Sequence, residues 1–225
     1  MSLLALPEPD SIARHFRRAL MDCQQGEVPY RHWTLTDVLP ESVGVNIICL
    51  PIAPLIIDDC HGVRDVDNNL RTFFTPWLQS RFPVCARLAE ALQQPEVARL
   101  MGEVCDFEVH GSHLRMEYIQ DINGAWLEPH HDVPEKLCSM VVYLCTGPDA
   151  AEWGTDIYDE NLRWVARSSA EFNSAAIFVP GENTWHGFEK RKIVGIRRLL
   201  EINYVHPSWR DRNQLCFPDR PVSIR

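Results

Sequence analysis

The chain has 225 residues, of which 45% are hydrophobic, and it carries a formal net charge of −9. This length and composition fit one sizeable domain with a substantial core, or a domain with an N-terminal extension. The acidic surplus argues against a nucleic-acid binder, because phosphate binding requires clustered Lys and Arg. A small-molecule partner is the better expectation.

The cysteines and the N-terminus bear on the compartment. Eight cysteines show no Cys-x-x-Cys pair and no regular spacing, which is typical of thiols in a reducing compartment. The start of the chain, MSLLALPEPDSIARHF, has only a short apolar run, so we expect neither a signal peptide nor an anchor. No apolar stretch has the length needed to span a bilayer. We therefore expect a cytoplasmic protein that does not enter a membrane, of open oligomeric state.

The first predicted element is an amphipathic helix. Asp10 is a suitable N-cap, and Ile12, Phe16 and Leu20 follow on one stripe at helical spacing. The Gln-Gln-Gly sequence at residues 24–26 predicts its end.

Two further segments complete the N-terminal part. Residues 43–57 (VGVNIICLPIAPLII) are rich in β-branched residues and contain two prolines, which favours one or two bent strands. Residues 70–103 contain mostly helix formers, and Pro76, Pro83 and Pro95 divide them into two or three predicted helices.

After Gly111 the pattern changes to short β-rich runs separated by turn residues. The eight predicted strands are residues 114–120, 125–131, 137–145, 154–159, 162–168, 175–181, 184–189 and 197–205. Such a succession is typical of a sandwich or jelly roll. We expect N-terminal helices and first strands over residues 1–110, the β core over 111–205 and an irregular tail over 206–225, all in one structural domain.

A candidate metal motif lies within this β-rich region. Residues i and i+2 of a strand point the same way, so His130 and Asp132 can converge on one ion. His186, on another predicted strand, can complete the set if the two strands meet. Two imidazoles and one carboxylate suit Fe(II) and leave positions open for an organic acid and dioxygen. Zinc accepts the same ligands, but the sequence has no HExxH-type helix to supply a hydrolytic base.

A His-x-Asp sequence by itself is more often a surface pair than a metal site. The order of features here is more specific: a small turn, His-x-Asp, several strands, the apolar run AAIFVPG, Trp-His-Gly at 185–187 and Gly-x-Arg at 195–197. With these features, residues 111–205 resemble the Fe(II)/2-oxoglutarate-dependent oxygenases, in particular the prolyl-hydroxylase-like and phytanoyl-hydroxylase-like branches.

The resemblance implies a fold and a set of site residues. The fold is an α+β protein whose double-stranded β-helix, a cupin-like jelly roll, is buttressed by the N-terminal helices. His130, Asp132 and His186 map onto the iron ligands. Arg197 maps onto the basic residue that binds the far carboxylate of 2-oxoglutarate, through two parallel hydrogen bonds from its guanidinium.

Other assignments stay open at this point. Arg198 is a rival to Arg197, because strand parity alone does not separate them. Tyr118 is a candidate contact for 2-oxoglutarate, with a core tyrosine as the alternative. Lys136 fits a solvated lysine better than a contact to an acidic substrate. Residues 59–69 (DCHGVRDVDNN) have the composition and length of a lid.

The resemblance also implies a function. It indicates a dioxygenase that uses Fe(II), 2-oxoglutarate and O2 to hydroxylate an unactivated C–H bond of a small molecule, releasing succinate and CO2. The carboxylate of Asp132 favours hydroxylation or desaturation over halogenation, because the halogenating members of the family lack it. The alternatives are a non-catalytic jelly-roll binding or sensor protein, and a cupin-type metal dioxygenase that does not use 2-oxoglutarate.

Overall fold

A computed structural model describes residues 4–54, 62 and 71–224. The predicted lid segment, residues 59–69, lies outside the described residues except for Gly62. The helices are α1 (Pro9–Met21), α2 (Glu41–Ile48), α3 (Pro76–Arg81), α4 (Pro83–Gln93) and α5 (Pro95–Cys105), with 3-10 turns at Ala150–Trp153 and Arg212–Gln214. The strands are β1 (Gln24–Gly26), β2 (His32–Leu35), β3 (Thr72–Phe73), β4 (His113–Asp121), β5 (Leu127–His130), β6 (Lys136–Tyr143), β7 (Asp156–Tyr158), β8 (Trp164–Arg167), β9 (Ser174–Phe178), β10 (His186–Phe188) and β11 (Arg197–Val205).

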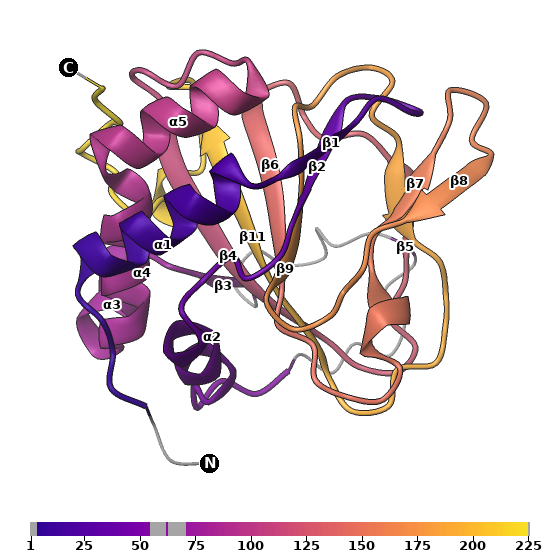
Figure 1. The fold of residues 1–225 in the computed structure, drawn as a ribbon, viewed down its shortest axis with the longest axis horizontal. Coiled ribbons are helices and arrows are strands. Elements are labelled where there is room, and N and C mark those ends of the chain that lie inside the picture. The colour runs from indigo at the N-terminus through magenta and orange to yellow at the C-terminus, as the bar shows by residue number, and fades with distance from the viewer. Residues whose placement is uncertain (1–3, 55–61, 63–70, 225) are drawn as a thin grey trace.

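The strands form two antiparallel sheets that face each other. The larger sheet has the order β1-β2-β9-β6-β11-β4-β3, and the smaller has the order β5-β10-β7-β8. Each of the eight strands predicted after Gly111 is present, with small differences at the ends. Helices α1, α3, α4 and α5 cover the face of the larger sheet that is turned away from the smaller one (Figure 1).

The main core lies between these helices and the larger sheet. Ile12, Phe16 and Leu20 are fully buried on α1, as their spacing predicts. Burying each such side chain is worth about 1.5–3 kcal/mol relative to leaving it exposed. Helix α1 begins at Pro9, so Asp10 lies in the first turn and is not the N-cap.

The prolines mark helix starts. Pro76, Pro83 and Pro95 are the first residues of α3, α4 and α5. Proline suits this position because the first N–H of a helix has no intrahelical partner and the proline φ is already helical. The prediction of separate helices in this segment is confirmed.

The prediction of strands over residues 43–57 is wrong where the structure describes them. Helix α2 occupies Glu41–Ile48, and Val43 and Ile47 on one of its faces are fully buried. The helix penalty of β-branched residues is only a few tenths of a kcal/mol each, so burial of this face overrides it. Pro51 follows the helix and lies outside it.

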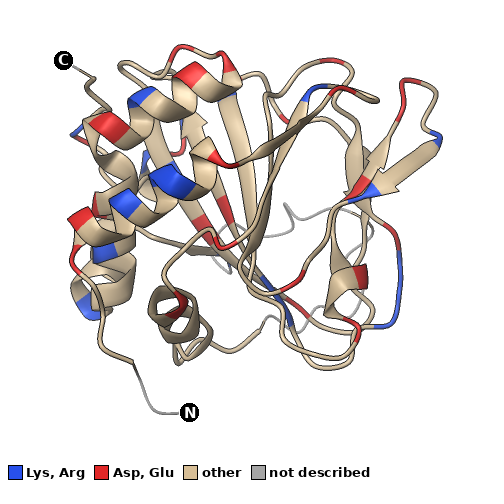
Figure 2. Ribbon diagram, viewed as in Figure 1, with Lys and Arg blue, Asp and Glu red and all other residues tan. Residues whose placement is uncertain are grey.

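The helices carry charged residues of both signs (Figure 2). Figure 2 shows acidic and basic residues interspersed along the helices in this view. None of the described helices is long and apolar enough to cross a bilayer. The cysteines within the described residues are free thiols.

Candidate metal centre

The two candidate histidines lie opposite each other on neighbouring strands of the smaller sheet. Strand β10 pairs with β5 in a register that places His186 beside His130. Their ring centroids are 4.3 Å apart. Asp132 lies two residues beyond His130, just after the end of β5. One donor atom from each of the three residues lies within 4.8 Å of the other two.

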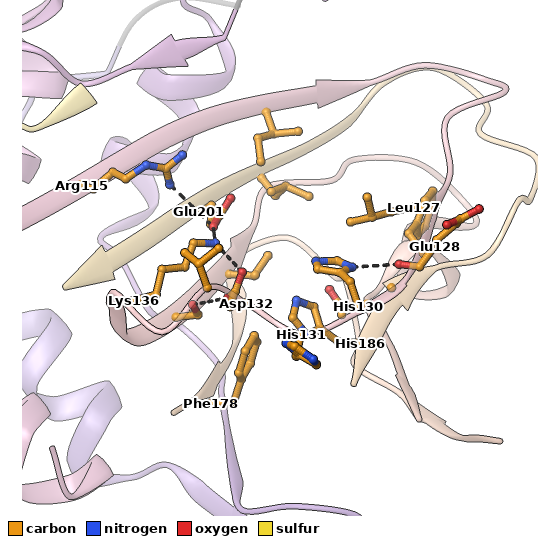
Figure 3. Close-up of a pocket in the computed structure, with 18 of the residues that line it drawn as sticks. Arg115, Leu127, Glu128, His130, His131, Asp132, Lys136, Phe178, His186 and Glu201 are labelled. Carbon is orange, nitrogen blue, oxygen red and sulfur yellow. Dashed lines mark hydrogen bonds and ion pairs between the residues drawn. The ribbon is translucent and has the colours of Figure 1, made fainter. Parts of the chain in front are cut away.

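Hydrogen bonds fix the tautomers of both imidazoles. His130 Nδ1–H donates to the carbonyl oxygen of Glu128 at 2.8 Å, as Figure 3 shows, and His186 Nδ1–H donates to that of Thr184 at 2.9 Å. A carbonyl oxygen only accepts, so Nδ1 must carry the proton in each ring. The lone pair of each neutral ring is therefore on Nε2, the arrangement that second-shell carbonyls typically impose on metal-binding histidines.

The protonation states of His186 and Asp132 also suit the binding of a metal cation. Burial lowers the pKa of His186 to about 4, so its imidazole is neutral at pH 7 and its lone pair is available. Burial raises the pKa of the Asp132 carboxyl, but the Lys136 ammonium and the His186 imidazole together lower it below its ordinary value. A carboxylate and two neutral imidazoles are the protonation states that a divalent metal requires.

Two residues hold the carboxylate of Asp132. Lys136 Nζ donates to Asp132 Oδ1 at 2.5 Å, and the Ser139 hydroxyl donates to Oδ2 at 2.6 Å. Lys136 is thus only 12% exposed at its side chain, and the expectation of a solvated lysine is wrong. It is buried because β6 begins with it and places it against Glu201 of β11.

The three residues open onto a pocket of about 670 Å³ between the two sheets. Phe178 packs against His186 with ring centroids 4.6 Å apart. His131 also lines the pocket, but its ring lies against Trp185 at 4.8 Å. His131 therefore packs against Trp185 and is not one of the candidate ligands, although it lies between His130 and Asp132 in the sequence.

Arg197 lines the same pocket and Arg198 does not. Successive side chains of a strand alternate in direction, so on β11 Arg197, Leu199 and Glu201 face the space between the sheets. Arg197 Nη1 donates to Asp121 at 2.5 Å and Nε donates to the carbonyl oxygen of Trp153 at 2.5 Å. Its Nη2 makes no hydrogen bond to any described residue and remains available to a ligand.

The structure does not bring Tyr118 into the pocket. Its side chain belongs to the main core on the other face of the sheet, together with Leu200 and Ile202. Arg198 lies on this face as well and interacts with Tyr118. Burial raises the pKa of Tyr118 to about 12. The alternative of a core tyrosine therefore describes this residue.

A buried network of charges extends from Asp132 into the larger sheet. Lys136 Nζ also donates to Glu201 at 2.5 Å, and Arg115 Nη1 lies 3.7 Å from the same carboxylate (Figure 3). Beyond it, Glu117 accepts from Arg115 at 2.9 Å and from Arg71 Nε at 2.7 Å. Sequence reasoning did not single out this network. The only signal for it was the alternation of charged residues along β4.

Comparison with known proteins supports the fold. No family model and no curated protein matches the sequence. Among solved structures, the chain is similar to a prolyl 4-hydroxylase from Phytophthora capsici, with TM-score 0.57, 9% identity and coverage of 90% of this chain and 66% of that one. It is also similar to a prolyl hydroxylase from Trichoplax adhaerens in complex with a hypoxia inducible factor peptide fragment, with TM-score 0.56, 10% identity and coverage of 88% and 90%.

A third similar structure is the 2-oxoglutarate complex of a viral collagen prolyl hydroxylase from Paramecium Bursaria Chlorella virus-1, with TM-score 0.51, 12% identity and coverage of 76% and 94%. At these identities the likeness establishes the fold. The expected fold class, an α+β protein with a double-stranded β-helix core and N-terminal helices, is confirmed.

Proposed function

We propose that this chain, which has the fold of the Fe(II)/2-oxoglutarate-dependent oxygenases, is itself an oxygenase that hydroxylates a small molecule. The observation that carries the proposal is the convergence of His130, Asp132 and His186 on one point of a pocket that Arg197 also lines. His130 and Asp132 come from the end of β5, His186 from β10 and Arg197 from β11, so their meeting is a property of the tertiary structure.

The residues present fit a ferrous ion. Both Nε2 atoms carry lone pairs, the carboxylate is ionised, and the three donors lie on one side of an open pocket. Two imidazoles and one carboxylate on one face are the ligand set of non-haem Fe(II) oxygenases. Bound there, Fe(II) would supply the oxidising chemistry, in which 2-oxoglutarate, O2 and a substrate C–H bond give succinate, CO2 and the hydroxylated substrate.

The protein's own residues orient the candidate metal ligands and anchor the co-substrate. Ser139 and Lys136 hold the Asp132 carboxylate in one position, and the carbonyls of Glu128 and Thr184 hold the two rings. Arg197 binds the far carboxylate of 2-oxoglutarate through its remaining N–H groups. Asp121 keeps the buried guanidinium in place before the co-substrate arrives.

Apolar walls favour a single orientation of the co-substrate. Ile119, Leu199 and Phe188 line the pocket along with Arg197. Thr155 also lines the pocket, and its hydroxyl is hydrogen-bonded to that of Tyr143. A five-carbon dicarboxylate placed here would have its charged end on Arg197 and its chain against apolar side chains.

The test is turnover of 2-oxoglutarate by the purified protein under air with Fe(II) and a reductant. We expect succinate to form slowly without added substrate, in step with loss of 2-oxoglutarate, and Asp132→Ala to abolish it. Iron binding without any binding or turnover of 2-oxoglutarate would instead identify a binding or sensor protein. Oxygen consumption that is independent of 2-oxoglutarate would favour a cupin-type dioxygenase.

A further inference from the structure

A second, smaller cavity lies beside the pocket of the candidate metal centre. It has a volume of about 80 Å³ and is lined by residues of β2, β6 and β9 of the larger sheet and of β7 and β8 of the smaller one. Val141, Thr155 and Phe178 line both this cavity and the larger pocket. The two spaces therefore share a wall, and we call the smaller one the side cavity.

Phe178 connects the side cavity to the candidate metal ligands. Its ring packs against His186, with ring centroids 4.6 Å apart (Figure 3). It also packs edge-on against Tyr30, which lines the side cavity, with ring centroids 6.2 Å apart. With this geometry, one aromatic side chain lies between the side cavity and a candidate metal ligand.

The surface of the side cavity is mainly apolar. Tyr30, Ile157 and Phe178 form a buried apolar cluster there, and Ala166 packs against it. Apolar cavities in proteins can hold apolar ligands, and a cavity of roughly 150 Å³ lined by Leu, Ile and Phe binds benzene or xenon. The side cavity is smaller, so it suits an apolar molecule of very few atoms.

Polar groups around the side cavity already have partners in the protein. The hydroxyls of Thr155 and Ser168 are hydrogen-bonded to that of Tyr143 at 2.6 and 2.7 Å, and Arg167 Nε donates to Asp156 at 2.9 Å. Within the described part of the chain, none of the buried side-chain polar atoms that lack a partner belongs to its lining. A water molecule in a cavity needs about two to four polar partners, so the side cavity favours an uncharged apolar occupant over water.

The side cavity has its own opening to solvent. Thr34 on β2 lines it and is exposed, and His32 beside it is half-buried. Exposed residues in the lining of the larger pocket, Glu128 and Asp211 among them, belong to other segments. The two spaces therefore meet the solvent at different places on the surface.

We propose that the side cavity is the route by which dioxygen reaches the candidate metal centre. This inference rests on the proposed oxygenase function and assigns to the side cavity a ligand, a small apolar gas. In that reaction the larger pocket holds 2-oxoglutarate at Arg197 and the substrate beside the candidate ligands. A separate apolar route lets O2 reach the candidate ligands without displacing either molecule.

Xenon tests whether the side cavity binds an apolar gas, independently of any turnover. The purified protein, with Zn(II) added as a redox-inactive metal, is labelled at its alanine and isoleucine methyl groups. We expect xenon under pressure to shift the NMR signals of Ala166 and Ile157 at least about threefold more than that of Ala151, which is exposed and outside the lining. Ala166→Leu adds three carbon atoms inside the side cavity and should remove the shift at Ile157.

The dependence of turnover on O2 tests the route itself. The rate of 2-oxoglutarate loss with Fe(II) is measured at O2 pressures from well below that of air up to pure oxygen. Ala166→Leu should raise the KM for O2 at least about threefold and leave kcat within twofold, because Ala166 lines the side cavity and not the larger pocket. Ala151→Leu, the same substitution at an exposed position, is the matched control. Ala176→Leu, which fills the side cavity from the larger sheet, is the second variant should Ala166→Leu fail to fold.

Each outcome decides the inference. Xenon shifts at the side cavity together with a raised KM for O2 in a filling variant support it. Absence of xenon shifts at Ile157 and Ala166, or a KM for O2 that stays unchanged in the filling variants, overturns the route and leaves the oxygenase proposal standing. A fall in kcat at an unchanged KM for O2 assigns these alanines a structural role and also overturns the route. A wild-type protein that turns over no 2-oxoglutarate at any O2 pressure overturns both proposals.

Discussion

The hydroxyl of Ser139 donates a 2.6 Å hydrogen bond to the Asp132 carboxylate and itself accepts one from the Asn203 amide at 3.0 Å. Ser139 is thus oriented from one side and orients Asp132 from the other. The carboxylate that is proposed to bind iron, just after the end of β5, is thus positioned by a residue on β6.

Ser139→Ala should therefore weaken metal binding without removing a ligand. Loss of an outer-shell partner typically costs 10- to 100-fold in metal affinity, and we expect about tenfold here because Lys136 still holds Oδ1. Calorimetry with Mn(II) measures the change. Ser80→Ala, at an exposed position on α3, is the control. Unchanged affinity in Ser139→Ala would mean that the bond to Asp132 has no part in metal binding.

The two neighbouring arginines of β11 should behave differently. Arg197→Met should lower the affinity for 2-oxoglutarate about 10- to 100-fold, because two charge-assisted hydrogen bonds are lost. Arg198→Met should leave it within twofold, since Arg198 lies on the other face of the sheet. Calorimetry on the Mn(II)-loaded variants gives both values, and the reverse order would assign the anchor to Arg198.

Gly187 keeps β10 close to β5. A Cβ at this position would lie 2.9 Å from the carbonyl oxygen of Leu127 and 3.1 Å from that of Glu128. Gly187→Ala should push the strands apart and separate His130 from His186, since these face each other across the same pair. We expect a loss of about 1–3 kcal/mol in the free energy of unfolding together with weaker metal binding.

Gly181→Ala is the control for this prediction, because its Cβ would meet neighbours only at ordinary contact distances of 3.5 Å or more. Chemical denaturation measures stability, and calorimetry measures metal affinity. If Gly187→Ala loses stability but keeps full metal affinity, the strand separation does not reach the candidate ligands.

The lowered pKa of His113 predicts that the stability of the folded protein depends on pH. Burial and the nearby charge of Arg212 lower the pKa of this imidazole below its ordinary value near 6.5. The unfolded chain therefore binds a proton more readily than the folded one, and stability is lost as the pH falls from above 6.5 through the folded pKa. His113→Gln removes this contribution.

The difference in free energy of unfolding between wild type and His113→Gln should thus shift in favour of the variant as the pH falls from 7.5 to 5. Urea denaturation at several pH values measures it. His110→Gln, an exposed histidine nearby, is the matched control. A difference that does not change with pH would mean that His113 titrates alike in both states.

Much of the local structure was predictable from the sequence, since it depends on near neighbours. Short β-rich runs between turn residues predicted each of the strands after Gly111, and Pro76, Pro83 and Pro95 marked the helix starts. Residues 43–57 show the limit of such reasoning. Their β-branched composition favours a strand, but α2 forms there because Val43 and Ile47 find a buried surface that only the folded protein offers.

The sequence by itself determined the residue types of the candidate site, because His-x-Asp and Trp-His-Gly are local patterns. Tertiary structure alone decided that His186 lies beside His130, that Arg197 and not Arg198 faces the pocket, and that Lys136 is buried against Asp132 and Glu201. The physical reason is strand pairing: register and sheet order set which distant side chains meet, and both depend on how the whole core packs.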